Sequence, residues 1–366
     1  MLHTARTPLW TWLLPLGGVI FFAIATSLGF DDQFSGSFLG MAIAALLVPL
    51  LIAAVFSAVY HAEDAAHITG EPFGTLILTI AVTVIELALI FSIMLTGKAS
   101  PTLVRDTVYA VIMIICTGLV GLCILVGGLR YREQSFDVTS TKIYLAVLLV
   151  IASLTLILPN YTQSAPGPTF TSSQLAFVSA VTIALYFVFL YTQTMLHRDY
   201  FTGERTDAFE PVTGGSSRLL KVIGLLSLAL VAVVVLAKLF AVVISSGVAW
   251  LGVPVGVTGV VIALIVLTPE SIAAVSAARK DNLQKSLNLA LGSSLATIGL
   301  TIPAVAVADI IMQQPLYLGL EPRDVVLLIT TLGASILTFG TGKTNVLFGF
   351  LHLVLFGVFL FLAFVP

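Results

Sequence analysis

The feature that most constrains this chain is a succession of long apolar segments separated by glycine, proline and polar clusters. About eleven of them have the roughly 20 residues that a helix needs to cross the hydrocarbon layer of a membrane. Only 9% of the 366 residues are charged, whereas soluble domains carry about 25%. The chain is therefore predicted to be an all-α polytopic membrane protein. The predicted helices cover residues 10–29, 37–60, 72–96, 105–128, 142–159, 172–196, 219–245, 252–278, 283–311, 322–340 and 344–365.

These segments argue against two other readings of an apolar chain. Strands of a transmembrane β-barrel are short and alternate polar with apolar residues, whereas the segments here are long and continuously apolar. The first segment could be mistaken for a signal peptide, but no small-residue cleavage site leading into a soluble domain follows it. We expect an extra N-terminal transmembrane helix within residues 1–30.

The basic residues predict an orientation, because Lys and Arg concentrate in cytoplasmic loops. With eleven helices and a cytoplasmic N-terminus, most of the 16 Lys and Arg fall in cytoplasmic segments. Only Lys98, Arg105 and Arg323 fall in outer loops, and Lys238 lies within a helix. The predicted topology has the N-terminus inside and the C-terminus outside.

The most polar connection, residues 197–218, divides the other helices into two sets of five. Because five is odd, the second set must enter the membrane in the opposite sense to the first. Inverted repeats are common in secondary transporters, which bind substrate near the membrane midplane where the repeats meet. The predicted organisation is a first five-helix repeat at 31–196, a cytoplasmic linker at 197–218 and a second five-helix repeat at 219–366.

One motif occurs at the matching place in both repeats. The sequence G-x-P-x-G at residues 70–74 and again at residues 252–256 precedes the second helix of each repeat. A glutamate lies deep in the apolar helix that follows, Glu86 in the first repeat and Glu270 in the second. An ionisable side chain at the centre of a membrane costs about 3 kcal/mol on insertion scales, and it is by default a functional residue. We predict that this pair binds cations or protons at the membrane midplane.

Hydroxyl side chains near the two glutamates are candidates for the same site. In the first repeat, Thr79 and Thr83 share a helical face with the glutamate. In the second repeat, Thr268 precedes the glutamate, and Pro269 stands between them. Because proline has no N–H, one backbone carbonyl of this helix is left free as an oxygen ligand.

The next helix of the second repeat carries Ser293, Thr297 and Thr301 at intervals of four residues. This stripe could line the same cavity. Hydroxyls at such a spacing also bond to the backbone of their own helix, and the sequence does not decide between the two roles.

Three further polar residues are candidates for a gate or a proton relay. Asp106 lies near the outer end of its predicted helix, where pairing with Arg105 or Lys98 is an equally good role. Asn345 and His352 could share a helical face near the C-terminus. For His352 a structural, hydrogen-bonded role is favoured over a relay.

Carboxylates, hydroxyls and carbonyls are the ligands of a hard cation such as Ca²⁺. Two glutamates could neutralise one divalent ion or could each take a proton, and exclusive occupancy by one or the other produces antiport. Because carboxylates alone do not determine valence, a Na⁺ or K⁺/H⁺ antiporter is the alternative. An intramembrane hydrolase is a remote one, since the sequence lacks a metal-binding cluster such as H-E-x-x-H. We expect no cofactor, with Ca²⁺ as a transported substrate bound as a metal by Glu86 and Glu270.

Several segments resemble a known family: "GEPFGTLILTIAVTVIELALI", "RDTVYAVIMI", "TPESIAAVSAA", "NLALGSSLATIGLTIP" and "TGKTNVLFG". Together, from about residue 61 to the C-terminus, they resemble the bacterial calcium/proton antiporters of the ChaA type, within the cation/Ca²⁺ exchanger superfamily. The resemblance implies two inverted five-helix repeats, with Glu86 and Glu270 as the acidic residues of a cation site. The second repeat retains the superfamily's Thr-x-Glu pattern, whereas the first has Ile85 where proline is common.

The resemblance also implies a secondary transporter rather than an enzyme, working by alternating access in a bacterial inner membrane. Its partners would be the transported cations and protons and the lipid bilayer, without nucleic acid. The oligomeric state is left open.

Overall fold

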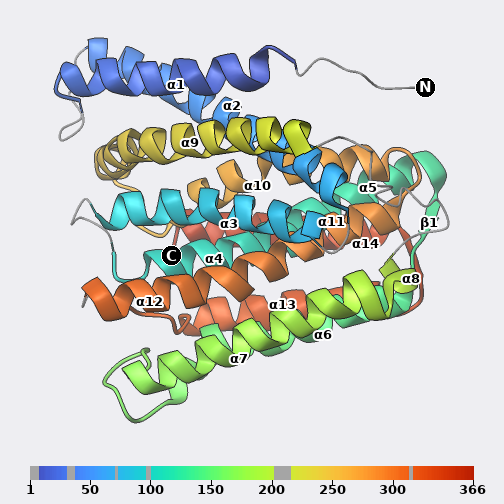
Figure 1. Ribbon diagram of the computed structural model, residues 1–366. Helices are drawn as coiled ribbons and strands as arrows, with labels where there is room; N and C mark the ends of the chain where they lie inside the picture. The colour runs from blue at the N-terminus through green and yellow to red at the C-terminus, as the bar shows by residue number, and fades with distance from the viewer. Residues whose placement is uncertain (1–7, 31–37, 71–72, 96–99, 202–215, 313–315) are drawn as a thin grey trace. The chain divides into compact units, whose positions relative to one another are not determined.

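The computed structural model describes all of the chain except residues 1–7, 31–37, 71–72, 96–99, 202–215 and 313–315 (Figure 1). The described residues are almost entirely helical, as predicted. Ten of their helical segments are long and apolar enough to cross a membrane. The α-helices are α1 (Trp10–Ser27), α2 (Phe38–Thr69), α3 (Phe73–Met94), α4 (Leu103–Met113), α5 (Val120–Tyr131), α6 (Val138–Ala152), α7 (Ser172–Tyr191), α8 (Arg198–Phe201), α9 (Ser216–Leu251), α10 (Val257–Ala278), α11 (Leu283–Ala296), α12 (Ile302–Met312), α13 (Pro322–Thr338) and α14 (Val346–Phe364).

Several long helices contain π-helical turns, which the sequence does not predict. The turn η1 (Ile114–Leu119) joins α4 to α5, and η5 (Thr297–Thr301) joins α11 to α12. The other short segments are π-helical η2 (Ser153–Ile157) and η4 (Thr192–Leu196) and 3-10 helical η3 (Leu158–Tyr161). The predicted segment 322–340 corresponds to α13, whose 17 residues are at the lower limit for a spanning helix.

The helices form two compact units. The first consists of Met1–Ala99 and Phe209–Gly252, and the second of Ser100–Ala208 and Val253–Pro366. Each unit therefore contains helices from both predicted repeats. The units group helices that contact one another in space, whereas the repeats were predicted from the order of helices along the chain. The predicted linker at 197–218 lies largely outside the described residues.

In the first unit, α2 packs against α1, α3 and α9 (Figure 1). Polar contacts join these helices at one end of α2. Arg218 at the start of α9 donates to Oδ1 of Asp64 at 3.0 Å. Nε2 of the buried His61 lies 3.1 Å from the carbonyl oxygen of Thr11. The helix α2 ends at Thr69, nine residues beyond the end at residue 60 that the apolar pattern predicts.

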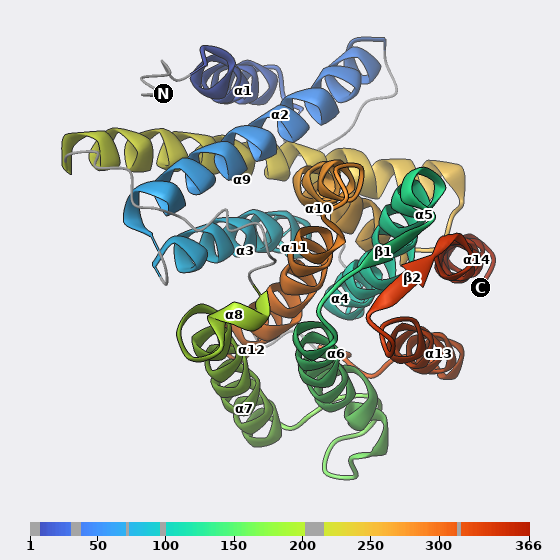
Figure 2. The same ribbon diagram turned by 90° about the vertical axis from the view of Figure 1, so that its right-hand side faces the viewer.

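In the second unit, α10 packs against α4, α5 and α11, and α14 packs against α5. A small antiparallel sheet, which an all-α prediction does not include, joins β1 (Glu133–Ser135) to β2 (Lys343–Asn345) (Figure 2). Glu133 pairs with Asn345 and Ser135 with Lys343. The sheet links the end of α5 to the start of α14, far apart in sequence.

Equivalent helices of the two repeats run in opposite directions within the second unit. The α4–η1–α5 helix begins at the end of the unit where Tyr317 N donates to Pro101 O, and it finishes beside the C-terminus of α10. The α11–η5–α12 helix begins at that second end, where Gln284 accepts from Asp137 N at 2.7 Å. It finishes shortly before Tyr317, at the first end. This reversal is what inverted repeats require.

The repeated motif has the same backbone conformation at its first glycine in both repeats. Gly70 follows the last residue of α2 with φ 68°, and Gly252 follows the last residue of α9 with φ 63°. This left-handed conformation closes a helix at little cost only for glycine. The motif therefore ends one helix. Its proline has no N–H to donate, so it cannot extend the hydrogen bonding of the preceding helix into the next one. In the first repeat, residues 71 and 72 lie outside the described residues.

Candidate functional site

In the first unit, Glu86 lies in the second half of α3, which is α-helical without interruption from Phe73 to Met94. Its side chain is 0% exposed. Thr83, one turn earlier, is also buried, and its hydroxyl donates to the carbonyl oxygen of Thr79 at 2.9 Å. The Thr83 oxygen keeps acceptor capacity, so it can still serve a cation beside Glu86.

In the second unit, Glu270 lies on α10 immediately after Pro269. The helix continues through the proline, which cannot donate to the carbonyl of Ile265. The hydroxyl of Thr268 donates to the carbonyl oxygen of Leu264 at 2.6 Å. A carbonyl that lacks its usual helical donor and a carboxylate about one turn later are both hard oxygen ligands.

Glu86 belongs to the first unit and Glu270 to the second. Joint binding of one ion by the two carboxylates therefore stays a prediction from the repeated motif. Each glutamate is nevertheless placed on the helix that follows that motif, as predicted.

The predicted hydroxyl stripe lies across a change of helix type. Ser293 is on α11, whereas Thr297 and Thr301 are the first and last residues of the π-helical turn η5. The hydroxyls of Ser293 and Thr301 are buried, and within the described chain neither has a hydrogen-bond partner. They therefore do not bond to the backbone of their own helix, which was the competing interpretation. An unsatisfied buried hydroxyl costs about 1–3 kcal/mol, and π-turns are frequent at functional sites.

Other buried hydroxyls were not singled out by the sequence. Ser294 on α11 and Ser179 and Thr182 on α7 likewise have buried oxygens without a partner among the described residues. The helix α7 packs against η5 and α12. Ser179 and Thr182 lie three residues apart, as side chains on one helical face do, but only the three-dimensional arrangement shows that their hydroxyls are buried without a partner in the described chain.

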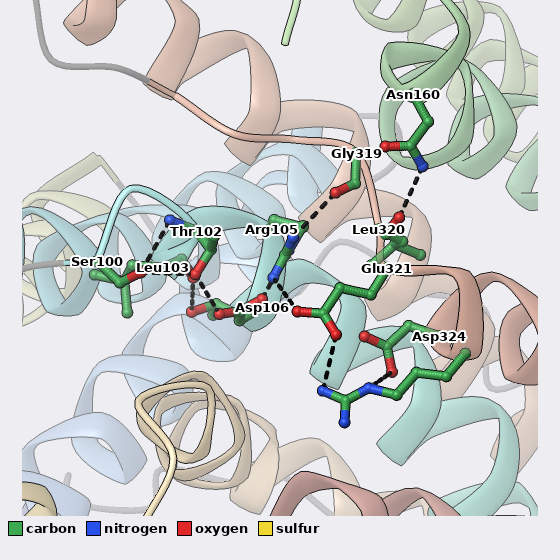
Figure 3. Close-up of polar contacts among 12 residues, drawn as sticks. Ser100, Thr102, Leu103, Arg105, Asp106, Asn160, Gly319, Leu320, Glu321 and Asp324 are labelled. Atoms are coloured by element: carbon green, nitrogen blue, oxygen red, sulfur yellow. Dashed lines mark hydrogen bonds and ion pairs between the residues drawn. The ribbon is translucent and has the colours of Figure 1, made fainter. Parts of the chain in front are cut away.

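Asp106, a predicted gate residue, lies in a cluster of charged side chains at one end of the second unit (Figure 3). Its Oδ1 accepts from Arg105 Nε at 2.8 Å, and its Oδ2 accepts from Thr102 Oγ1 at 2.7 Å. The guanidinium of Arg105 also donates to the carbonyl oxygen of Gly319 at 3.0 Å and lies 4.0 Å from Glu321. Pairing of Asp106 with Arg105 is thus present, whereas Lys98 lies outside the described residues.

The same carboxylate faces the motif of the second repeat. A Cβ placed on Gly256 would lie 3.6 Å from Oδ2 of Asp106. One placed on Gly259 would lie 2.7 Å from backbone atoms of Asp106 and Thr107, so glycine permits the close approach of α4 and α10. Asp106 therefore lies at the N-terminus of the helix that carries Glu270, where the helix dipole favours a negative charge.

The two remaining candidates make local contacts. Asn345 caps α14, where its side-chain oxygen accepts from Leu347 N at 3.0 Å. Nδ1 of the buried His352 lies 2.8 Å from the carbonyl oxygen of Cys116, and its Nε2 lies 3.0 Å from the hydroxyl of Thr338. Because a carbonyl only accepts, Nδ1 carries a proton and Nε2 accepts from Thr338 in the neutral ring. These contacts favour a structural role for His352.

A resident metal centre is not evident in the described part of the chain, where no three His, Cys, Asp or Glu side chains gather to hold an ion. The buried oxygens are instead distributed as single carboxylates, hydroxyls and carbonyls on different helices.

The known proteins that this chain resembles are described as ion exchangers, transporters or antiporters. The family model described as "Sodium/calcium exchanger protein" matches residues 34–195 and 221–365. The protein y4hA of Sinorhizobium fredii, assigned as an ionic transporter, is 42% identical over 366 residues, covering 100% of this chain and 98% of that one. The sodium-potassium/proton antiporter ChaA of Escherichia coli is 36% identical over 310 residues, 83% of this chain and 84% of its own. The crystal structure of the Ca²⁺/H⁺ antiporter YfkE has a similar fold, with a TM-score of 0.72, 15% identity and coverage of 97% and 99%.

Proposed function

The chain belongs to the sodium/calcium exchanger protein family, and from that premise we propose that it is a proton-coupled cation antiporter working by alternating access. Its first candidate substrate is Ca²⁺, exported in exchange for protons. The observation that carries this proposal is the deep glutamate in the matching helix of both repeats, with Glu86 fully buried in α3.

Exchange follows from the cost of an uncompensated charge in the membrane. When both glutamates are ionised, their charge matches one divalent cation, and when both are protonated no cation is needed. If the site held neither, two ionised carboxylates at membrane depth would have no compensating charge, which is unfavourable. Ca²⁺ and protons therefore replace each other at Glu86 and Glu270, and each crosses the membrane only in turn.

Neutral oxygens complete the ligand set. Ca²⁺ takes about six to eight oxygen ligands, more than two carboxylates supply. The first repeat offers the hydroxyls of Thr79 and Thr83. The second offers the Ile265 carbonyl, freed by Pro269, and the buried hydroxyl of Ser293. We place Thr268 and Thr297 in the outer part of this shell.

A Na⁺ or K⁺/H⁺ antiporter is the second candidate. ChaA, a sodium-potassium/proton antiporter, shares 36% identity with this chain, whereas the Ca²⁺/H⁺ antiporter of Aphanothece halophytica shares 25%. A monovalent ion would need one ionised glutamate, with the other protonated. In this proposal the same glutamates and neutral oxygens bind either cation.

Orientation follows from the charges of the second unit. Arg130, Arg279, Lys280 and Lys343 lie at the end that carries the sheet and the α10 C-terminus, whereas Arg105 and Arg323 lie at the other end with Asp106 and Glu321. The basic end would face the cytoplasm under the positive-inside rule. With this orientation in a bacterial inner membrane, export would carry Ca²⁺ from the basic end to the end with Asp106.

Transport in proteoliposomes tests the proposal. Vesicles with an internal pH dye and an imposed pH gradient are challenged separately with Ca²⁺, Na⁺ and K⁺. We expect Ca²⁺ to dissipate the gradient, and the variants Glu86→Gln and Glu270→Gln each to abolish the signal. Glu133→Gln, at an exposed strand residue, is the matched control and should transport normally. Failure of all three cations would refute antiport, and response to Na⁺ or K⁺ alone would establish the second candidate.

A further inference from the structure

A groove of about 660 Å³ follows α10 in the second unit, between that helix and the α4–η1–α5 helix. Its apolar lining includes Ile114, Leu122, Leu264, Ile272 and Val275. Ile272 is 57% exposed, Leu264 45% and Leu122 40%. Because these residues belong to membrane-spanning segments, the open side of the groove is an apolar surface at membrane depth.

The groove lies on the side of α10 away from Glu270, although Thr268, a candidate for the outer cation shell, also lines it. Its lining residues on α10 recur at 264, 268, 272, 275 and 279, which is one face of a helix. Glu270 is two residues from Ile272, about 200° around the helix axis. The carboxylate therefore points away from the groove.

One end of the groove is strongly basic. Arg130, Arg279 and Lys280 line it there, and Arg279 and Lys280 are exposed. Nη1 of Arg130 donates to the carbonyl oxygen of Arg279 at 3.2 Å, which holds this guanidinium at the C-terminus of α10. The nearby carboxylate of Asp281 accepts from Gln134 at 3.0 Å. The described lining of the groove thus holds three basic side chains and no acidic one.

The groove has the length and polarity of a membrane lipid. From Leu264 to Lys280, α10 rises about 24 Å, which is more than half of the ~30 Å hydrocarbon layer. Its lining along this length is mainly apolar, with the hydroxyls of Thr268, Ser271 and Ser276 among the apolar side chains, and it is cationic at the membrane surface. Its volume lies within the range of about 300–1,000 Å³ typical of ligand sites.

We propose that this groove binds one anionic phospholipid, with its phosphate among Arg130, Arg279 and Lys280 and an acyl chain along Leu264 and Ile272. Basic pockets between transmembrane helices recognise anionic headgroups in this way. A free metal cation would be repelled by the three basic side chains. A small soluble anion has no apolar part that could contact the apolar length of the groove.

Native mass spectrometry of the purified, detergent-solubilised protein tests this site. The protein is titrated with dioleoyl phosphatidylglycerol, dioleoyl phosphatidylcholine and glycerol 3-phosphate. Two variants remove the two halves of the site: R279Q/K280Q removes headgroup charge, and S276W fills the groove at an exposed lining position. Lys343→Gln, at the same end but outside the groove lining, is the matched control.

We expect one tightly bound phosphatidylglycerol in the native protein. Each basic residue near the surface contributes about 1 kcal/mol to anionic lipid binding, so R279Q/K280Q should weaken it about 30-fold. S276W should also weaken it at least tenfold, while the control retains native affinity. Thermal unfolding in detergent verifies that each variant is folded. Equal affinity for phosphatidylcholine, equally tight binding of glycerol 3-phosphate, or native affinity in folded R279Q/K280Q would overturn the proposal.

Discussion

Arg105 and Asp106 are consecutive residues whose side chains form an ion pair, with Nε of Arg105 2.8 Å from Oδ1 of Asp106. The side chains are only 9% and 16% exposed, so water and salt screen the pair weakly. The guanidinium also reaches the carbonyl of Gly319 and so ties α4 to the segment before α13. Asp106 thus has a structural task in addition to any part in gating.

Removing one charge of this pair should cost more than removing both. Asp106→Asn leaves the Arg105 guanidinium without its nearest carboxylate, and we expect about 1–3 kcal/mol lower stability. Arg105→Gln combined with Asp106→Asn should recover part of that loss. Thermal unfolding of the two single variants and the double variant gives the coupling energy. Strict additivity would show that the pair contributes nothing to stability.

Gly259→Ala should destabilise the protein, because the new methyl group would lie 2.7 Å from backbone atoms of Asp106 and Thr107. Overpacking of this kind costs about 1–3 kcal/mol. The matched control is Gly333→Ala on α13, where a Cβ meets nothing within 4 Å and the helix gains about 0.5–1 kcal/mol. Opposite shifts of the unfolding temperature are expected, and equal shifts would contradict the close approach of α4 and α10.

His352→Leu should lower stability without moving the pH profile of transport. The substitution removes the hydrogen bonds to Cys116 and Thr338, and each buried partner left unsatisfied costs about 1–3 kcal/mol. Unfolding temperature and the pH dependence of Ca²⁺-driven proton flux are measured on the same preparation. A shifted pH midpoint at unchanged stability would instead support the proton relay.

Ser293→Ala and Ser286→Ala should have opposite effects on stability. Ser293 has a buried hydroxyl with no partner in the described chain, so its removal should be neutral or stabilising. Ser286 donates to the carbonyl oxygen of Ala274 at 2.9 Å, and its loss should destabilise by about 1 kcal/mol. If Ser293 is a cation ligand, only its variant raises KM for Ca²⁺. An unchanged KM would remove Ser293 from the proposed ligand shell.

Pro269→Ala should make α10 more regular and transport slower. Alanine restores an N–H that can donate to the carbonyl of Ile265, so we expect higher stability by about 1 kcal/mol or more. The same bond withdraws that carbonyl from the cation, which should raise KM for Ca²⁺. A stabilised variant with native KM would show that the carbonyl is not a ligand.

The all-α membrane class, the approximate helix positions and the matching places of Glu86 and Glu270 were predictable from the sequence alone. They depend on local quantities: the length of apolar segments relative to the membrane, and the cost of a carboxylate within them. The glycine conformation at Gly70 and Gly252 is also a local property, because a left-handed residue after a helix requires glycine or a close substitute.

Only the tertiary structure decided which polar groups are satisfied and which face of each helix is used. The partners of His352 come from residues 14 and 236 positions away, and the lack of a partner for the buried hydroxyls of Ser179 and Thr182 within the described chain depends on the helices packed around them. The π-helical turn η5 shifts the register of α12 relative to α11, and α2 continues past residue 60 to Thr69. These features depend on packing between distant segments, which the order of residues along one helix does not specify. For the same reason, the sequence does not predict the basic groove on the side of α10 opposite Glu270, because packing of α5 against α10 forms it.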